Sequence, residues 1–226
     1  MDKYMKYPQA VNEHIINSLK SLNTKEEFNV LELGCSTAMN LKAVHDLYPK
    51  SHCFGVDISM DAIREAKKLL PNASFWCADI EKQPNLFERE LFDFILLPDI
   101  LEHLTKPDEA LKYIKHILKP DGYVIASVPN LMCWNIMANL IQFGNFTYTE
   151  TGLLDYTHKH LFTYNEIIRL FNDCEYEIKD CFYISPIEEE EKEYENFINK
   201  LVELSNGNVS IFQYKAFTYY IVARKL

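Results

Sequence analysis

Glycine is scarce in this sequence, with six glycines among 226 residues. A dinucleotide loop of the G-x-G-x-x-G kind needs several glycines close together so that the backbone can approach a pyrophosphate, and a Walker loop also ends in Lys-Ser/Thr. Neither pattern occurs in "VLELGCSTAMN" (Val30 to Asn40), where a buried strand meets a small-residue turn and Gly34 is the only glycine. The scarcity argues against a pyrophosphate-binding loop at this place.

Positive charge and long apolar runs are also lacking. The chain has 23 Lys and Arg against 33 Asp and Glu, a formal net charge of -10 and a pI of about 5.2, without a Lys/Arg cluster. This balance would repel a phosphate backbone, so we expect no nucleic-acid partner. No stretch approaches the roughly 18 apolar residues of a membrane span, and the opening "MDKYMKYPQA" lacks the apolar region of a signal peptide. We therefore expect no membrane span and no secretion.

The chain has no C-x-x-C pair among its six cysteines, which disfavours a zinc site built on cysteine spacing. Cys35, Cys53 and Cys77 lie in or beside apolar, strand-like runs. The spacing predicts buried free thiols, and free thiols are typical of a reducing compartment. The expected location is cytoplasmic.

Strand-like and helix-like patterns alternate five times in the first 130 residues. This alternation predicts a parallel sheet with helices on both faces, an α/β fold. Later, "YEIKDCFYI" (176–184) and "YKAFTYYIVARK" (214–225) read as two more strands, joined by the charged helix that starts at "EEEEKE". We expect them to form an antiparallel edge of a mixed sheet. The five early strands are expected at 28–34, 52–59, 73–80, 91–100 and 121–129.

Carboxylates mark the ends of the predicted strands, where ligands bind in open α/β sheets. Asp57 lies 23 residues beyond Gly34, near the offset of roughly 20 at which an acid meets a ribose diol. Its alternative role is to cap the next helix. Asp79 is a candidate contact to an adenine amine, or else an acid in a turn. Asp99 follows the fourth strand.

The loop after the first strand favours a cofactor without phosphates. Ser36 and Ala38 stand where a nucleotide loop would place two further glycines, so a backbone approach to pyrophosphate would be tight. Glu32 supplies negative charge beside the loop, which suits a sulfonium cation with an amino-acid tail. The residues therefore favour S-adenosyl-L-methionine over a dinucleotide.

The chain resembles the class I S-adenosylmethionine-dependent methyltransferases. The likeness rests on "VLELGCSTAMN", "GVDIS", "CADI", "FDFILLPDILEHL" and "LKPDGYVIASVPN" in this order. It implies a Rossmann-like, doubly wound sheet of seven strands, mostly parallel with the last strand antiparallel, and helices on both faces. The family's loop is commonly E-x-G-x-G-x-G, which Gly34 matches and Ser36 and Ala38 do not. The implied cofactor contacts are Glu32, Gly34, Cys35, Ser36, Asp57, Ile58, Ala78, Asp79, Ile80 and Pro98.

A narrower likeness concerns the methyl acceptor. The stretch "GLLDYTHKHLFTYNEIIRLF" is similar to the D-x-T-H…F-T segment of methyltransferases linked to cell-surface polysaccharide or lipid-like acceptors. It implies a small-molecule or glycan/lipid-like acceptor, with a hydroxyl as the expected methylated group. We expect one methyltransferase domain over residues 1–226, with residues 131–164 as an acceptor-side insertion or cap.

A histidine is the expected base for a hydroxyl acceptor, because its ordinary pKa of roughly 6.5 allows it to accept a proton at neutral pH. His103, beside the end of the fourth strand, is the first choice, and His158 in the "DYTHKH" loop is the second, ahead of His160. Asp99, Glu102 and His103 could instead bind a divalent metal, as a similar group in ubiquinone-pathway methyltransferases suggests, or simply begin a helix. No metal is assigned.

Two other functions stay open at this point. The strand–helix–strand start and Asp57 would suit an NAD-dependent oxidoreductase, although the glycine motif is missing. The departures at Ser36 and Ala38 would suit a non-catalytic protein that partners another enzyme. The sequence does not name the acceptor atom or the oligomeric state. An N-terminal lid formed by Tyr4, Lys6 and Tyr7 is a further possibility beside an ordinary terminus.

Overall fold

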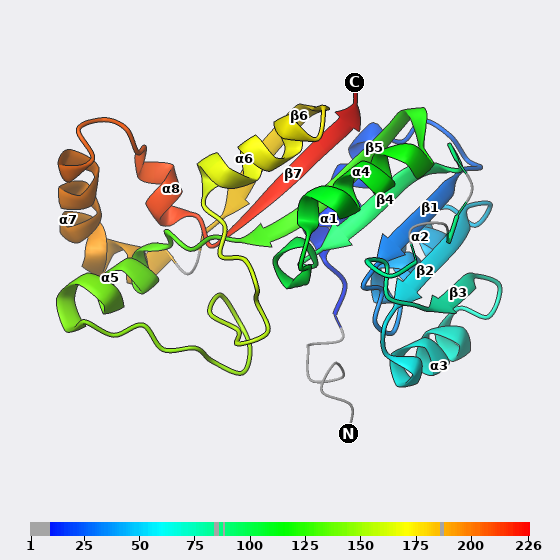
Figure 1. Cartoon of the computed structure of the whole chain (residues 1–226), viewed down its shortest axis with the longest axis horizontal. Helices are drawn as coiled ribbons and strands as arrows, with labels where there is room; N and C mark the ends of the chain where they lie inside the picture. The colour runs from blue at the N-terminus through cyan, green and yellow to red at the C-terminus, as the bar shows by residue number, and fades with distance from the viewer. Residues whose placement is uncertain (1–9, 84–85, 88, 186–187) are drawn as a thin grey trace.

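The computed structural model describes residues 10–83, 86–87, 89–185 and 188–226, so the N-terminal lid suggested above lies outside the described residues. Seven strands form one sheet in the order β3-β2-β1-β4-β5-β7-β6 (Figure 1). All strands run parallel except β7, which pairs antiparallel with both β5 and β6. The doubly wound fold with an antiparallel last strand is confirmed. The strands are β1 (Asn29–Leu33), β2 (His52–Asp57), β3 (Ser74–Cys77), β4 (Phe92–Pro98), β5 (Leu118–Pro129), β6 (Tyr176–Ile184) and β7 (Thr218–Lys225).

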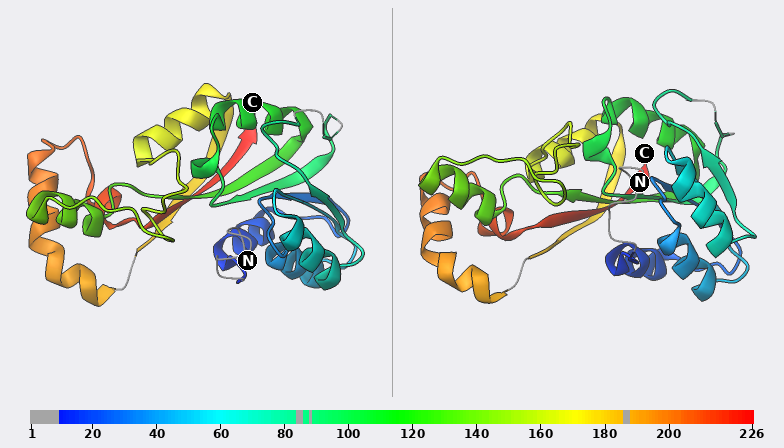
Figure 2. Two further views of the ribbon diagram at one scale, coloured as in Figure 1. Left: turned by 60° about the horizontal axis from the view of Figure 1, so that its bottom comes forward. Right: turned by 90° about the horizontal axis from the view of Figure 1, so that it is seen from below.

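Helices cover both faces of the sheet, as Figure 2 shows. One face packs on α1 (Glu13–Leu22), α2 (Met39–Leu47) and α3 (Met60–Leu69), with Leu19 and Ile63 buried against Val30 and Leu96. The other face packs on α4 (Pro107–Ile117) and α6 (Tyr164–Asp173). Because neighbouring residues of a strand point to opposite faces and both faces are covered, the central strands are mostly apolar, with Glu32 of β1 and Asp93 of β4 as buried exceptions.

The short connections begin their helices with ordinary capping residues. Asn12 and Ser59 accept hydrogen bonds from the backbone of Ile15 and Ala62, which caps α1 and α3. Pro107 opens α4, where a missing backbone N–H costs nothing. These signals are local, which is why the sequence predicts these helix starts to within a few residues.

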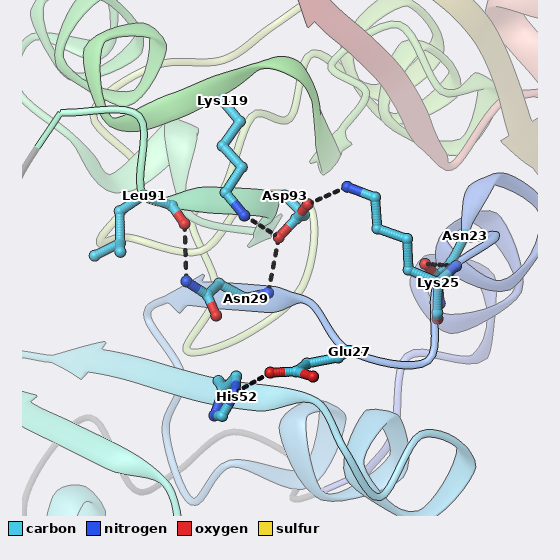
Figure 3. A network of polar contacts seen from close by, with 8 residues as sticks. All are labelled: Asn23, Lys25, Glu27, Asn29, His52, Leu91, Asp93 and Lys119. Atoms are coloured by element: carbon cyan, nitrogen blue, oxygen red, sulfur yellow. Dashed lines mark hydrogen bonds and ion pairs between the residues drawn. The ribbon is translucent and has the colours of Figure 1, made fainter.

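Asp93 joins the starts of three strands, at the end of the sheet opposite to the predicted site. Figure 3 shows its contacts. Its buried carboxylate accepts hydrogen bonds from Lys25 (2.6 Å), Lys119 (2.7 Å) and the backbone N–H of Asn29 (2.9 Å). Burial alone would raise the pKa of Asp93, but the hydrogen bonds from Lys119 and Lys25 outweigh it and hold the pKa below its ordinary value. The network therefore ties the starts of β1, β4 and β5 together.

The structure corrects two boundaries of the predicted strands and specifies their order at one side of the sheet. β5 begins at Leu118, so Asp121 and Gly122 lie within the strand, beside a register shift in its pairing with β4, and form no turn before it. The predicted strand 214–225 is shorter, because residues 211–215 form the helix α8 (Ile211–Lys215). β7 also lies between β5 and β6, so β6 is the edge strand.

Beyond β5, three helices form a lobe of their own at the carboxyl ends of the parallel strands (Figure 1). The helices of this helical lobe are α5 (Trp134–Phe143), α7 (Glu188–Leu204) and α8, and their buried core includes Trp134, Ile136 and Ile198. The sequence assigned only residues 131–164 to a cap; α7 and α8 complete its core. No helix in the described part of the chain is long and apolar enough to cross a membrane.

All six cysteines are free thiols, as predicted, but they are not all buried. Cys77 is exposed at the end of β3, where the short edge strand leaves one side of its last residue uncovered. The expectation of a buried Cys77 is therefore wrong, whereas Cys35 and Cys53 are buried.

Candidate cofactor and acceptor site

The loop after β1 keeps a glycine-like backbone without the glycines. Gly34, Ser36 and Ala38 all have positive φ angles, of 70°, 45° and 66°. These are the positions of the three glycines in the family's E-x-G-x-G-x-G pattern. For Ser36 and Ala38 the left-handed conformation costs roughly 1–2 kcal/mol each. The surrounding structure therefore enforces the turn at two of its three positions.

At Gly34 a side chain would be strained by the positive φ angle and would have to displace the end of the Ile100 side chain. A Cβ atom there would lie 2.9 Å from Cδ1 of Ile100, closer than real Cβ contacts. The backbone N–H groups of Gly34 and Cys35 both donate to the carbonyl oxygen of Val56, at 2.8 and 3.0 Å. The loop is thus pressed between the end of β2 and the residues that follow β4, which brings three strand ends together.

Asp57, the predicted ribose ligand, accepts hydrogen bonds from the loop. One carboxylate oxygen accepts from the backbone N–H of Ser36 at 2.8 Å, and the other accepts from that of Ser59, also at 2.8 Å. The backbone carbonyl of Asp57 accepts from Ala78 N–H at 2.9 Å. Ser59 is the N-cap of α3, and Asp57 accepts its backbone N–H, so Asp57 supports the cap without being it, while its ribose role stays a prediction.

Glu32 is the buried acid beneath this loop. Its Oε1 accepts a 2.7 Å hydrogen bond from the amide of Asn40 on α2, and its Oε2 has no hydrogen-bond partner. Burial raises the pKa of Glu32 to about 8, against the opposing hydrogen bond from Asn40, and the nearby charge of Asp57 raises it further. A buried carboxyl with an unsatisfied oxygen is suited to receive a cationic ligand group. Sequence reasoning missed Asn40.

The remaining predicted cofactor contacts lie on the same edge of the sheet. Asp79 follows β3 and forms an ion pair with Lys82 at 2.7 Å, and the hydrogen bond from Lys82 lowers the pKa of Asp79. Ala78 is buried, Ile80 is half-buried, and Ile58 exposes nearly half of its apolar surface between β2 and α3. The others are Cys35, which is buried, and Pro98, which ends β4 opposite Ser127 of β5.

A second group of polar side chains lies just beyond β4. The structure brings together Glu102, His103 and His158, whose ligand-type atoms all lie within 4.8 Å of one another. Glu102 and His103 belong to the short 3-10 helix η2 (Leu101–His103), whereas His158 comes from the "DYTHKH" loop. The two imidazole rings meet edge to face with centroids 4.7 Å apart. The two histidines predicted as bases are therefore neighbours.

Hydrogen bonds fix the tautomers of both histidines. Thr157 gives its hydroxyl hydrogen to Asp155 at 2.6 Å, so its oxygen can only accept from Nδ1 of His103 at 3.1 Å. Nδ1 of His158 lies 3.1 Å from the carbonyl of Leu153, which only accepts. In the neutral rings both protons are therefore on Nδ1, and both Nε2 atoms carry a lone pair. Sequence reasoning assigned no role to Asp155 and Thr157, although both belong to the D-x-T-H motif.

Burial sets the charge of this cluster. It lowers the pKa of His103, which neighbouring His158 lowers further, and it lowers the pKa of His158 against the opposing charge of Asp155. The pKa of Glu102 is raised well above its ordinary value, first by burial and then by the charge of Asp99. Both imidazoles are therefore neutral at pH 7.

Asp99 adjoins the cluster but has its own partner. Ser127 donates a 2.8 Å hydrogen bond to its carboxylate, and the backbone of Asp99 adopts a positive φ of 48°. Desolvation by the surrounding protein raises the pKa of Asp99, even though part of the residue is exposed to solvent. The hydrogen bond from Ser127 opposes this rise. The sequence suggested a group of Asp99, Glu102 and His103. In the structure the group contains His158 in place of Asp99.

Backbone hydrogen bonds attach the "DYTHKH" loop to η2. The N–H groups of Lys159 and His160 both donate to the carbonyl oxygen of Glu102, at 2.8 and 3.1 Å. The side chain of His160 points to another partner, with Nε2 3.3 Å from the carbonyl of Thr105. His158 is held beside Glu102, and His160 does not join the cluster.

These features define a class of protein: a Rossmann-like methyltransferase fold with a cofactor loop and a polar cluster at adjoining strand ends. The residues present fit S-adenosyl-L-methionine, because the unsatisfied Oε2 of Glu32 offers a buried partner for a cation beside a tight loop with three positive φ angles. When bound, this cofactor supplies an electrophilic methyl group on a sulfonium.

Comparison with known proteins assigns the family. The family described as a methyltransferase domain matches residues 24–200, and the chain belongs to it. A malonyl-(acyl-carrier protein) O-methyltransferase of Bacillus anthracis is 26% identical over 129 residues, which are 56% of this chain and 47% of that protein. The chain thus spans about half the length of the curated relatives it matches.

Solved structures share the fold at low sequence identity. A SAM-dependent methyltransferase from Archaeoglobus fulgidus superposes with a TM-score of 0.65 and 17% identity, over 94% of this chain and 92% of that one. The (4+2)-cyclase SpnF superposes with a TM-score of 0.64 and 14% identity, over 94% and 80%. Together, the fold and the family match place the chain in the methyltransferase-domain family.

Proposed function

We propose that this methyltransferase transfers the methyl group to an oxygen of a small-molecule or glycan-like acceptor, and that the oxygen is a hydroxyl. The observation that carries the proposal is the pair of neutral imidazoles, His103 and His158, placed at the end of β4 beside the cofactor loop. A hydroxyl is a weak nucleophile until its proton is removed, so an oxygen acceptor benefits from a base.

The two histidines have the protonation state that a base requires. The lowered pKa values favour the neutral form of both rings, and with Nδ1 bonded as described the proton of the acceptor would go to Nε2. In the proposed reaction the acceptor O–H gives its proton to one Nε2 while the oxygen forms a bond to the methyl carbon. The carbon–sulfur bond breaks, and its electron pair stays on sulfur as a neutral thioether. We assign His103 first and His158 second.

A carboxylate acceptor is the second candidate, because the Bacillus anthracis relative is named for malonyl bound to an acyl-carrier protein. A carboxylate oxygen at neutral pH has no proton to lose, so a base would have no part in its methylation. The buried pair of neutral imidazoles therefore favours the hydroxyl. The two candidates make opposite predictions for the histidine variants.

The helical lobe is the proposed acceptor side of the site. Residues 131–164 leave β5 at the same sheet edge as the cofactor loop, and the chain returns from them through the "DYTHKH" loop to η2. Exposed apolar side chains of the lobe, at Leu140, Ile141 and Phe143, would suit an acceptor with an apolar part. The cap assigned from the sequence remains part of this proposal.

The test is turnover of His103→Ala and His158→Ala against a panel of hydroxylated and carboxylated acceptors. We expect turnover of a hydroxylated acceptor to fall about a hundredfold in His103→Ala, with unchanged affinity for S-adenosylhomocysteine by calorimetry. His116→Ala, at an exposed position of α4, is the matched control. Full turnover of both histidine variants from pH 6 to 9, or activity confined to carboxylates, would contradict the hydroxyl assignment.

A further inference from the structure

We infer that Glu81 is a positioning residue that connects the cofactor side of the site to the loop that carries His158. Glu81 follows β3 and lies two residues beyond Asp79. Its carboxylate reaches the connection between η2 and α4 and also faces the "DYTHKH" loop (155–160). The inference rests on the proposed function, because it concerns the loop that holds one of the two proposed bases.

The carboxylate of Glu81 holds the connection that leads into α4. Its Oε1 accepts hydrogen bonds from the backbone N–H groups of Thr105 and Lys106, both at 2.8 Å. Lys106 is the N-cap of α4, and its own side chain makes no capping hydrogen bond. Glu81 therefore satisfies, from a distant segment, one of the N–H groups that a helix start leaves unpaired, and its negative charge is favourable at a helix N-terminus.

The same carboxylate is ionised at neutral pH. Burial alone would raise the pKa of Glu81, but the hydrogen bonds from Thr105 and Lys106 outweigh it and hold the pKa below its ordinary value. The other oxygen, Oε2, lies 3.9 Å from Nζ of Lys159 in the "DYTHKH" loop. Half of the Lys159 side chain is exposed, so this ion pair is weak by itself and the two backbone hydrogen bonds are the main contacts of Glu81.

The connection that Glu81 holds is also the anchor of the "DYTHKH" loop. Nζ of Lys159 donates to Oγ1 of Thr105 at 2.8 Å, and Nε2 of His160 lies 3.3 Å from the carbonyl oxygen of Thr105. The backbone N–H groups of the same two loop residues donate to the carbonyl oxygen of Glu102. His158 directly precedes this anchored pair, so its position depends on where residues 102–106 lie.

The other end of the link is Asp79, the predicted adenine contact. Oδ1 of Asp79 accepts from the backbone N–H of Glu81 at 3.0 Å, and the carbonyl oxygen of Asp79 accepts from the N–H of Lys82, also at 3.0 Å. The predicted cofactor contact thus closes the turn from which Glu81 extends. A cofactor that restricts Asp79 also restricts Glu81 and, through it, the anchor of His158. Cofactor binding and the order of the loop are therefore positively coupled.

The test is hydrogen exchange of the full chain, measured by mass spectrometry with and without S-adenosylhomocysteine and without any acceptor. In the wild type we expect S-adenosylhomocysteine to slow exchange in residues 153–160, although none of its predicted contacts lies there. Glu81→Ala should accelerate exchange in these residues by about tenfold or more, because hydrogen bonds to a charged group are lost. The slowing by S-adenosylhomocysteine should disappear, while its affinity by calorimetry stays within about twofold.

Two further variants separate the contact from its charge and from its surroundings. In Glu81→Gln an amide oxygen still accepts from Thr105 and Lys106, so most of the protection of the loop should return. Glu109→Ala is the matched control, because Glu109 pairs with Lys106 on the exposed side of the same helix start. Its loss should leave exchange in residues 153–160 unchanged.

A merely structural role of Glu81 predicts a different result. Exchange in Glu81→Ala would then accelerate alike in β1, in α4 and in the loop, and this outcome would overturn the inference. Loop exchange in the wild type that does not respond to S-adenosylhomocysteine would overturn it as well. If Glu81→Ala does not fold, Lys159→Ala tests the same link from the loop side and should accelerate loop exchange by about threefold or more. Turnover does not enter the measurement, so failure of the histidine-base proposal would leave this result intact.

Discussion

The sheet and the helical lobe differ in how completely they bury their apolar side chains. The sheet buries an apolar core on each face, and the loop and acids of the candidate cofactor site lie at its strand ends. The lobe has a small core around Trp134 and Ile136, yet it exposes 58% of Ile141 and 63% of Phe143. An exposed apolar surface of this kind marks a place where something else binds. The comparison separates the half that we propose to hold the cofactor from the half that we propose to meet the acceptor.

The strongest test of this division is Ile136→Ala in the lobe. The side chain is 5% exposed, so its truncation should cost about 2–5 kcal/mol of lobe stability. We expect hydrogen exchange to accelerate in residues 131–143 and to stay slow in β1 and β4. Ile141→Ala, on the exposed side of the same helix, should change stability by less than about 0.5 kcal/mol. Loss of S-adenosylhomocysteine binding in Ile136→Ala would show that the two halves fold as one unit.

Asp57→Ala should weaken cofactor binding by about 1.5–3 kcal/mol, because a charged acceptor of ribose hydrogen bonds is lost. The same carboxylate accepts a hydrogen bond from Ser36 N–H, so part of this loss comes from a loosened loop. Calorimetric titration with S-adenosylhomocysteine measures the effect. Asp61→Ala, at an exposed position in the first turn of α3, is the control. Affinity within twofold of wild type would place the ribose contact elsewhere.

Glu32 makes cofactor binding depend on pH. Its pKa is raised to about 8, so the carboxyl is protonated at pH 6 and ionises as the pH rises. The neutral form of Glu32 contributes to the free energy of unfolding. This contribution is present at low pH and is lost as the pH rises through the folded-state pKa of about 8. The cation of S-adenosylmethionine favours the ionised form, so its affinity should rise by up to about tenfold per pH unit from pH 6 to 7.5.

The matched variant for this prediction is Glu32→Gln, which keeps the hydrogen bond from Asn40 and removes the titrating group. Its affinity for S-adenosylmethionine should be low and nearly constant across the same pH range. A parallel rise in the variant would assign the pH dependence to another group.

The smallest expected effect is a gain. Ser36→Gly should stabilise the protein by about 0.5–1 kcal/mol, because the φ of 45° is strained for serine and free of strain for glycine, although glycine also gains entropy in the unfolded chain. Chemical denaturation measures the change. Gly34→Ala is the inverse control, since its φ of 70° and the 2.9 Å approach to Ile100 both penalise a methyl group. Destabilisation by Ser36→Gly would show that the serine side chain contributes more than the strain removes.

The sequence predicts most of the sheet because its signals are local. The end of β2 at Asp57, the end of β3 two residues before Asp79, and the N-cap at Ser59 follow from short patterns of apolar and capping residues. The α8 helix was missed because the aromatic run from Tyr214 resembles a strand, although Ser210 and Gln213 form a capping box. The cofactor family followed from the order of several weak motifs.

Local sequence patterns cannot predict that the residues of the polar cluster contact one another. His103 and His158 are far apart in the chain, and no local periodicity encodes a meeting of two loops. The same holds for Asn40 beneath the cofactor loop and for Thr157, whose hydroxyl decides a tautomer. These contacts depend on tertiary packing of segments with no repeating pattern.

The place of β7 in the sheet has a consequence for synthesis on the ribosome. β6 is finished at Ile184, but its only neighbour in the sheet is β7, which begins at Thr218. A nascent chain halted at Phe217 would hold β5 with one edge open and β6 without any partner, and open apolar edges are templates for association between chains. Completion of the sheet therefore waits for residues 218–225, and until then this end of the molecule depends on protection from aggregation.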